Sequence, residues 1–190
     1  MPTARDSLLN AALGALEERP WDTVRMVEVA AAAGVSRQTL YNEFGGKDGL
    51  ARALVRRAAD DYLAGVEHVL AAAGRRGADA GECLAAATAW TLHAARRSAL
   101  LREALTGCRG RRLPAAPDPS PGDLVEALRG RAVGAVEQCG PRCGAADIGR
   151  ACDAAARLTL SYVLVPAPSD EDACLEVSRL VRGLLNGAAA

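Results

Sequence analysis

The stretch GVSRQTLYNEFGGKDGL, residues 34–50, decides the fold of this chain. The whole sequence contains two Trp, three Tyr and one Phe, yet Tyr41 and Phe44 both fall within this segment. Leu40 and Phe44 are four residues apart and would share one face of a helix. We therefore expect a short helix that buries Leu40 and Phe44 and leaves its opposite face in solvent.

The residues around the start of this helix predict a tight turn. A helix over residues 25–33 should end at Gly34, which supplies the backbone freedom that a C-terminal cap needs. Val35 would fill the space between the two helices. Ser36 would cap the second helix through its hydroxyl group. Two short helices joined in this way predict a helix-turn-helix.

The outer face of the second helix suits the major groove of DNA. Its side chains are polar: Arg37, Gln38, Tyr41 and Asn42. Arginine forms paired hydrogen bonds with guanine, and asparagine or glutamine with adenine. Hydroxyl groups and a lysine at a helix N-terminus suit phosphate groups. The set predicts an element that reads DNA sequence.

This run closely resembles the recognition helix and following turn of TetR/AcrR-type bacterial regulators, over about residues 5–57. The matching residues are Ala30, Ala33, Gly34, Val35, Ser36, Thr39, Leu40, Tyr41, Phe44, Lys47 and Leu50. The resemblance implies an all-α protein. It would have a three-helix DNA-binding domain at residues 1–47, joined by a long helix to a ligand-binding and dimerisation domain at residues 48–190.

The resemblance also implies a role for each DNA-facing residue. The residues concerned are Arg25, Ser36, Arg37, Gln38, Thr39, Tyr41, Asn42 and Lys47. Arg37, Gln38 and Asn42 would read bases. Thr39 and Tyr41 would touch phosphate or base, whereas Arg25 and Lys47 would hold backbone phosphates.

Two residues depart from the family's usual pattern. Arg25 stands where threonine is more usual, and Glu43 brings a carboxylate close to the expected phosphates. Glu43 would repel DNA unless Arg37 or Lys47 pairs with it. The charge of residues 1–57 is also nearly balanced, so this segment predicts weak non-specific affinity for DNA.

The bulk composition agrees with an all-helical protein. The 190 residues are 50% hydrophobic but only 3% aromatic, and the formal net charge is zero, which by itself indicates no nucleic-acid partner. Further helices are expected from about residue 47 to 73 and over 80–97, 98–107, 122–138, 145–165 and 170–187, with a proline-rich loop over 107–122. No signal peptide or membrane span is expected, so we expect a cytoplasmic protein without a membrane partner.

Two aromatic rings in the second half indicate a ligand pocket. Trp90 and His93 are three residues apart and would share a helix face, with Tyr62 and Val66 on the long helix opposite. The effector would be a small, apolar molecule of unknown identity. The alternative is that Trp90 is a core residue and His93 an ordinary residue at its edge.

The last two helices indicate a dimer interface. Apolar residues cover more than one face of them, and the candidates are Leu158, Tyr162, Leu175, Leu180 and Leu184. A two-fold dimer would present two recognition helices about 34–36 Å apart, one DNA turn, or somewhat farther. The alternative is an ordinary pair of helices within one chain.

The favoured function is a ligand-responsive regulator that binds a palindromic operator as a dimer, commonly as a repressor, and is released by its effector. The sequence contains no phosphate-binding loop, serine-nucleophile motif or zinc-protease motif, so we expect no enzyme, no cofactor and no metal. One alternative is a thiol sensor that uses Cys139 with Cys143, or Cys108. Another is a helical protein-interaction module that does not bind DNA.

Overall fold

The computed structural model describes residues 3–108, 119–139 and 143–187, and all regular secondary structure within these ranges is helical. The elements are α1 (Ala4–Glu18), η1 (Trp21–Thr23), α2 (Met26–Ala32), α3 (Arg37–Phe44), α4 (Lys47–Arg75), α5 (Ala80–Arg97), α6 (Ala99–Thr106), α7 (Pro121–Gln138), α8 (Ala145–Leu164) and α9 (Asp170–Gly187). The all-α prediction is confirmed. Most of the loop predicted over 107–122 lies outside the described residues.

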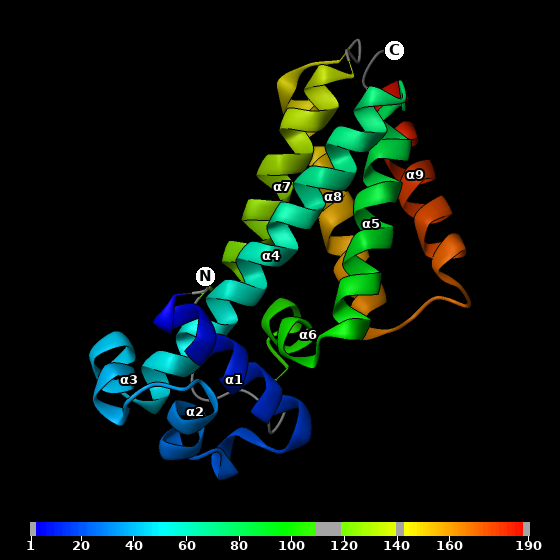
Figure 1. The fold of residues 1–190 in the computed structure, drawn as a ribbon. Helices are drawn as coiled ribbons and strands as arrows, with labels where there is room; N and C mark the ends of the chain where they lie inside the picture. The colour runs from blue at the N-terminus through cyan, green and yellow to red at the C-terminus, as the bar shows by residue number, and fades with distance from the viewer. Residues whose placement is uncertain (1–2, 109–118, 140–142, 188–190) are drawn as a thin grey trace.

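The helices form two parts that share α4 (Figure 1). Helices α1 to α3 gather at one end of the molecule around the start of α4. The rest of α4 runs into a bundle with α5, α7, α8 and α9. The short helix α6 lies at the end of the bundle that faces α1. The arrangement leaves α3 at the outer end of the molecule.

Local sequence signals explain where most helices begin. Ser120 caps α7 and its Oγ accepts a hydrogen bond from the amide of Asp123. The hydroxyl of Ser169 accepts from the amide of Asp172 in the same way at the start of α9. Asp79 caps α5 in a reciprocal pair with Glu82, which the sequence analysis did not single out.

Each part has its own buried residues, and those named below belong to one continuous core. In the N-terminal part, Leu8, Leu40 and Leu50 are fully buried, and they join α1, α3 and α4. In the bundle, Val66, Val136 and Val177 are fully buried. Because α4 contributes to both groups, a change in its tilt is shared by both parts.

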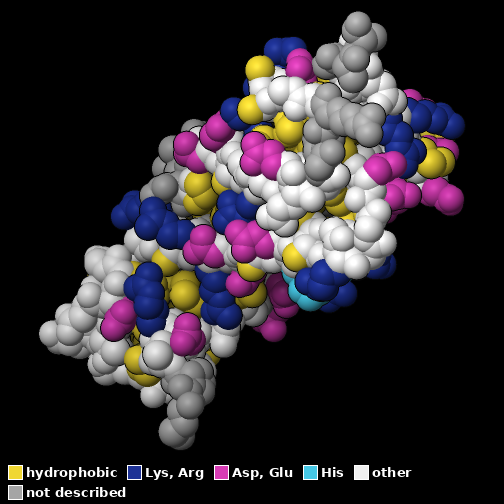
Figure 2. All heavy atoms as spheres, turned by 90° about the horizontal axis from the view of Figure 1, so that it is seen from above, with side chains coloured by type: hydrophobic (Ala, Val, Ile, Leu, Met, Phe, Trp, Pro, Cys, Tyr) yellow, Lys and Arg dark blue, Asp and Glu magenta, His cyan; other side chains and the backbone are white. Residues whose placement is uncertain are grey.

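Charges of both signs are interspersed over the face seen from above (Figure 2). None of the helices described here is both long and apolar enough to cross a lipid bilayer.

Candidate nucleic-acid interface and effector cleft

The turn between α2 and α3 has the geometry of a helix-turn-helix. Gly34 adopts a positive φ of 68°, which favours glycine. The amide of Val35 donates to the carbonyl of Ala30 at 3.0 Å and closes the turn. The Oγ of Ser36 accepts from the amide of Thr39 at 3.0 Å and caps α3. The hydroxyls of Ser36 and Thr39 also lie 2.8 Å apart, so both are fixed at the N-terminus of α3.

The outer face of α3 is polar and open to solvent. Arg37, Gln38, Tyr41 and Asn42 are all exposed, whereas Leu40 is fully buried. The guanidinium of Arg37 lies 5.3 Å from the centre of the Tyr41 ring, and its Nη2 donates to the Tyr41 hydroxyl at 3.4 Å. This contact aligns the two side chains along one edge of the helix. Their contacts with DNA stay predictions.

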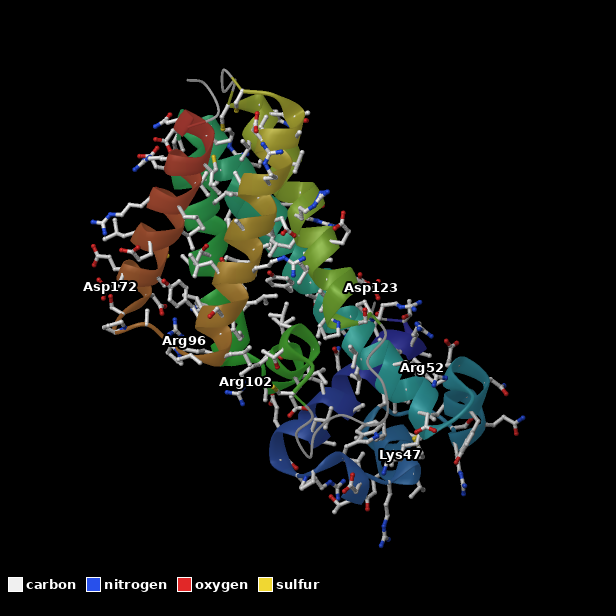
Figure 3. The ribbon with its side chains drawn as sticks, turned by 180° about the vertical axis from the view of Figure 1, so that it is seen from behind. Lys47, Arg52, Arg96, Arg102, Asp123 and Asp172 are labelled. Carbon is white, nitrogen blue, oxygen red and sulfur yellow. The ribbon has the colours of Figure 1, made fainter. Side chains whose placement is uncertain are left out.

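Lys47 is held in place by η1, the short turn before α2. Its Nζ donates to the carbonyl of Asp22 at 3.0 Å and lies 5.4 Å from the centre of the Trp21 ring. Trp21 itself is buried. A cation at the start of a helix is disfavoured by the helix dipole, and the carbonyl and the ring offset this cost. Figure 3 shows Lys47 at the end of the molecule formed by the N-terminal helices.

Arg25 follows η1 in the chain. It is exposed and occupies the N-cap position of α2, although the sequence analysis had placed it inside the helix. Its side chain makes no capping hydrogen bond. The guanidinium is therefore not used to begin α2.

The partner of Glu43 differs from both residues expected in the sequence analysis. Neither Arg37 nor Lys47 pairs with it; instead, Nη1 of Arg5 lies 3.6 Å from its carboxylate. The same nitrogen donates to the Glu43 carbonyl at 3.4 Å. The Arg5 guanidinium also lies 4.7 Å from the centre of the Phe44 ring. Helix α1 thus supplies the positive charge that balances Glu43, and it docks against the end of α3.

A cleft of about 480 Å³ opens where the two parts of the molecule meet. Tyr62, Trp90 and His93 line it, as do Leu9 and Leu13 of α1. Leu54 of α4 and Leu100 and Leu101 of α6 add to its apolar wall. Its charged lining residues are Arg57, Asp61 and Arg97. Val66, the fourth residue predicted for a pocket, is fully buried and is not among the lining residues.

Trp90 is fixed by contacts with α4. Its Nε1 donates to the carbonyl of Tyr62 at 3.0 Å. Gly65 makes room for the indole, because a Cβ there would lie 2.1 Å from Cζ2 of Trp90. The Trp90 and His93 rings are 6.3 Å apart between centres. The cleft therefore has a rigid aromatic wall on α5.

Tyr62 is buried at the edge of the cleft, with its hydroxyl 3.0 Å from that of Thr91. Burial raises the pKa of Tyr62 to about 12, although the hydrogen bond with Thr91 acts in the opposite direction. The phenol stays neutral at ordinary pH. A second pair of hydroxyls, of Thr88 and Thr159, lies 2.9 Å apart between α5 and α8. The space beside this pair holds only about 10 Å³ and is effectively closed.

The residues predicted for a dimer interface lie on α8 and α9. Leu175 and Leu184 are 47% and 40% exposed, which is high for leucine. Leu158, Tyr162 and Leu180 are partly buried. The end of α8 adds Leu164, which is 54% exposed and was not predicted. These positions leave an apolar surface in solvent, and their role in a dimer stays a prediction.

The cysteines are arranged differently from the expected pair. Cys139 lies 3.6 Å, sulfur to sulfur, from Cys83, a residue 56 positions away that was not among the predicted sensor cysteines. Cys143 is partly buried and Cys108 is exposed. Among the described residues, no group of three or more His, Cys, Asp or Glu side chains could hold a metal ion.

An exposed helix-turn-helix at one end of a helical bundle defines a class of DNA-binding regulators. The family model described as bacterial regulatory proteins, tetR family, matches residues 8–54. A second model, described as the C-terminal domain of the bacterial tetracyclin repressor, matches residues 79–182, more than half of the chain. The chain belongs to the TetR family of bacterial transcriptional regulators. These proteins are not enzymes, so the expectation of no enzymatic activity is confirmed.

Individual relatives agree with this assignment. The chain is 50% identical over 56 residues to the HTH-type transcriptional regulator AlkX of Mycobacterium tuberculosis, a match over 30% of this chain and 26% of that protein. The chain thus matches about a quarter of the curated relative's length. The solved TetR family repressor AlkX of a Dietzia species has a TM-score of 0.64 at 23% identity, over 99% of this chain and 98% of that one.

A transcriptional regulator of Cytophaga hutchinsonii has a TM-score of 0.67 at 15% identity, over 96% of this chain and 97% of that one. At these identities, the two solved structures establish a shared fold.

Proposed function

We propose that this chain is a repressor that binds a palindromic operator as a homodimer and leaves it when a small apolar effector binds. The observation that carries the proposal is the exposed polar face of α3, in which every predicted base-reading residue is open to solvent while Leu40 is buried. The DNA-binding part would comprise residues 1–47, and the effector and dimer functions would lie in residues 48–190. A DNA-binding regulator of this kind works in the cytoplasm.

The contacts divide by chemistry. Arg37, Gln38 and Asn42 would meet base edges, because their groups match guanine and adenine in the major groove. Tyr41 and Thr39 would contact phosphate or base. Lys47 and Arg25 would neutralise phosphates at the two edges of the helix-turn-helix. Ser36 would hold the N-terminus of α3 against the phosphate backbone of the DNA.

The effector would occupy the cleft between α1, α4, α5 and α6. Its walls are largely apolar, and its size of about 480 Å³ suits a small molecule. Leu9 and Leu13 belong to the DNA-binding part, whereas Trp90 and His93 belong to the bundle. A molecule in this cleft would therefore contact both parts of the protein. It would release DNA only if it binds the DNA-incompetent arrangement more tightly than the competent one.

The names of relatives agree with an apolar effector. The Dietzia repressor is implicated in biodegradation of n-alkanes, and a FadR regulator of Bacillus subtilis was solved with stearoyl-CoA. Both names refer to long hydrocarbon chains. The leucine-rich walls of the cleft would suit such a chain.

The dimer would form through α8 and α9. The exposed Leu175 and Leu184 would be covered by the same residues of a second copy, since a two-fold interface pairs each patch with itself. Leu158, Tyr162 and Leu180 would extend the contact.

The experiment is fluorescence anisotropy of the reduced protein with DNA flanking its own gene, across a salt series. Tyr41→Ala should lower the affinity by about tenfold or more, because α3 loses a contact and the alignment of Arg37. Arg76→Ala is the matched control, since it removes an exposed cation at the far end of α4. An affinity that changes neither with salt concentration nor with Tyr41→Ala would instead favour a protein-interaction module.

A further inference from the structure

Two cysteines from distant parts of the chain meet between α5 and α7. Cys83 lies in the first turn of α5, and Cys139 is the C-terminal cap of α7. Their sulfur atoms are 3.6 Å apart, close to van der Waals contact. A disulfide bond has a sulfur–sulfur length of about 2.05 Å, so its formation requires an approach of roughly 1.5 Å.

The two thiols differ in access to solvent. Cys83 is fully buried, whereas Cys139 is partly exposed. Cys139 also lines an open groove of about 760 Å³ between α4 and α7, together with Gly74, Gly134 and Ala135. Cys139 therefore borders space that a small oxidant can enter, whereas Cys83 does not line the groove.

The burial and hydrogen bonds of the two thiols also indicate that Cys139 reacts with an oxidant before Cys83 does. Burial, together with the hydrogen bond with Cys139, raises the pKa of Cys83 to about 12. Cys83 is thus a protonated thiol at neutral pH and a poor first nucleophile. The Cys139 thiol donates to the carbonyl of Ala135 at 3.3 Å, which keeps its sulfur beside both the groove and Cys83.

We propose that Cys83 and Cys139 form a redox-active dithiol that a hydroperoxide converts into an intramolecular disulfide. The Cys139 thiol gives up its proton and its sulfur attacks one oxygen of the peroxide. A sulfur–oxygen bond forms and the oxygen–oxygen bond breaks, so that Cys139 becomes a sulfenic acid. The departing oxygen takes up the proton and leaves as an alcohol, or as water when the oxidant is hydrogen peroxide. The sulfur of Cys83 then attacks the sulfenic sulfur. Cys83 loses its proton, the sulfenic oxygen leaves as water, and the two thiols have together lost two electrons to the peroxide.

The disulfide would join the first turn of α5 to the end of α7. These points are 56 residues apart, so the bond would close a long loop and restrict the unfolded chain. It would also fix the edge of the groove that Cys139 lines. A thiol reductant would reverse the reaction, as expected for a switch in a reducing compartment.

The test treats the reduced, folded protein with hydrogen peroxide and blocks the remaining thiols before digestion without reductant. Mass spectrometry should find Cys83 linked to Cys139 and two of the six thiols lost. The thermal midpoint should rise by on the order of 5 °C and return after reduction. In Cys83→Ser, dimedone should trap a sulfenic acid on Cys139.

The controls are Cys108→Ser and Cys143→Ser, which should leave the cross-link unchanged. Cys139→Ser should lose the cross-link and leave Cys83 a free thiol. A bond from Cys139 to Cys143, a bond between two chains, or oxidation confined to the exposed Cys108 would overturn the proposal. So would a Cys83 that stays reduced while Cys139 proceeds to sulfinic acid.

Discussion

Gly49 lies against the carbonyl group of Phe44: a Cβ atom added at Gly49 would stand 1.8 Å from that oxygen and 2.9 Å from its carbon. The end of α3 and the start of α4 are thus in backbone contact. Only glycine allows this approach, because both atoms belong to the main chain and cannot rotate away. The orientation of the recognition helix on α4 depends on this position.

Gly49→Ala should therefore destabilise the protein by about 2 kcal/mol or more, through displaced backbone at the junction of α3 and α4. Urea unfolding would measure the change. Gly14→Ala is the matched control, since nothing lies within 4 Å of its added Cβ and it sits inside α1. That variant should gain about 0.5–1 kcal/mol. Equal losses in both variants would contradict the role assigned to Gly49.

Lys47→Ala should weaken binding to DNA by a similar factor for every DNA sequence. The lysine is held on the carbonyl of Asp22 and the Trp21 ring, ready for a phosphate. Its loss should lower the dependence of log affinity on log salt by about 1, the value for one phosphate contact. A salt series by anisotropy measures this slope. An unchanged slope would mean that Lys47 serves only to hold η1 against α4.

Arg5 should matter for DNA binding through Glu43. Arg5→Ala leaves the carboxylate of Glu43 without its partner and should lower operator affinity by severalfold. Glu43→Gln should raise affinity. In the double variant the loss caused by Arg5→Ala should become smaller, and this coupling is measurable as a double-mutant cycle. Additive effects would show that Arg5 acts on DNA without Glu43.

The free energy of unfolding should fall at high pH because of Tyr62. Its folded pKa is raised to about 12 from an ordinary value of 10.0, so the unfolded chain gives up this proton first. The contribution is complete below pH 10 and disappears as the pH rises to about 12. At about 1.4 kcal/mol per pKa unit, the loss is roughly 2–3 kcal/mol.

Tyr62→Phe should flatten this part of the stability profile, measured by urea unfolding at several alkaline pH values. The tyrosinate absorbance of the wild type should show one step that appears only with unfolding. Tyr162→Phe serves as the control, because Tyr162 is only partly buried. A profile that stays unchanged in Tyr62→Phe would assign the alkaline loss to other groups.

Gly65→Ala should impair the effector cleft without affecting the DNA-binding face. The added Cβ would lie 2.1 Å from the Trp90 indole and would displace the indole from its position against α4. Quenching of tryptophan fluorescence by palmitic acid should then require about tenfold more ligand, while operator affinity changes little. Gly74→Ala, also on α4 but with nothing within 4 Å, should behave as wild type.

The helices could be predicted because their signals are local. Ser36 and Gly34 act within a few residues of their own positions, and each marks a boundary that the structure shows. The same holds for the buried face of α3, which follows from the spacing of Leu40 and Phe44. The predicted start of α2 differs from the observed one by one residue. Arg25 is the N-cap of the helix and not its first helical residue.

The remaining features depend on contacts between distant segments, which spacing does not reveal. Arg5 meets Glu43 across 38 positions, and Lys47 meets Asp22 across 25. The cleft includes Leu9 and Leu13 because α1 crosses α4, and Val66 is excluded because its helix face turns inward. A buried tryptophan next to a polar turn, as at Trp21, is the sequence signal that could have indicated the partner of Lys47.

The length of the unbroken α4 determines how far its end moves when the helix tilts. Its 29 residues span about 43 Å at 1.5 Å per residue. A rod of this length that tilts by about five degrees about its far end moves its other end by roughly 4 Å, about the rise of one base-pair step along a DNA strand. Because α3 is fixed to that end through Gly49, a change of this size in the angle of α4 would shift α3 by one step in register on a bound operator.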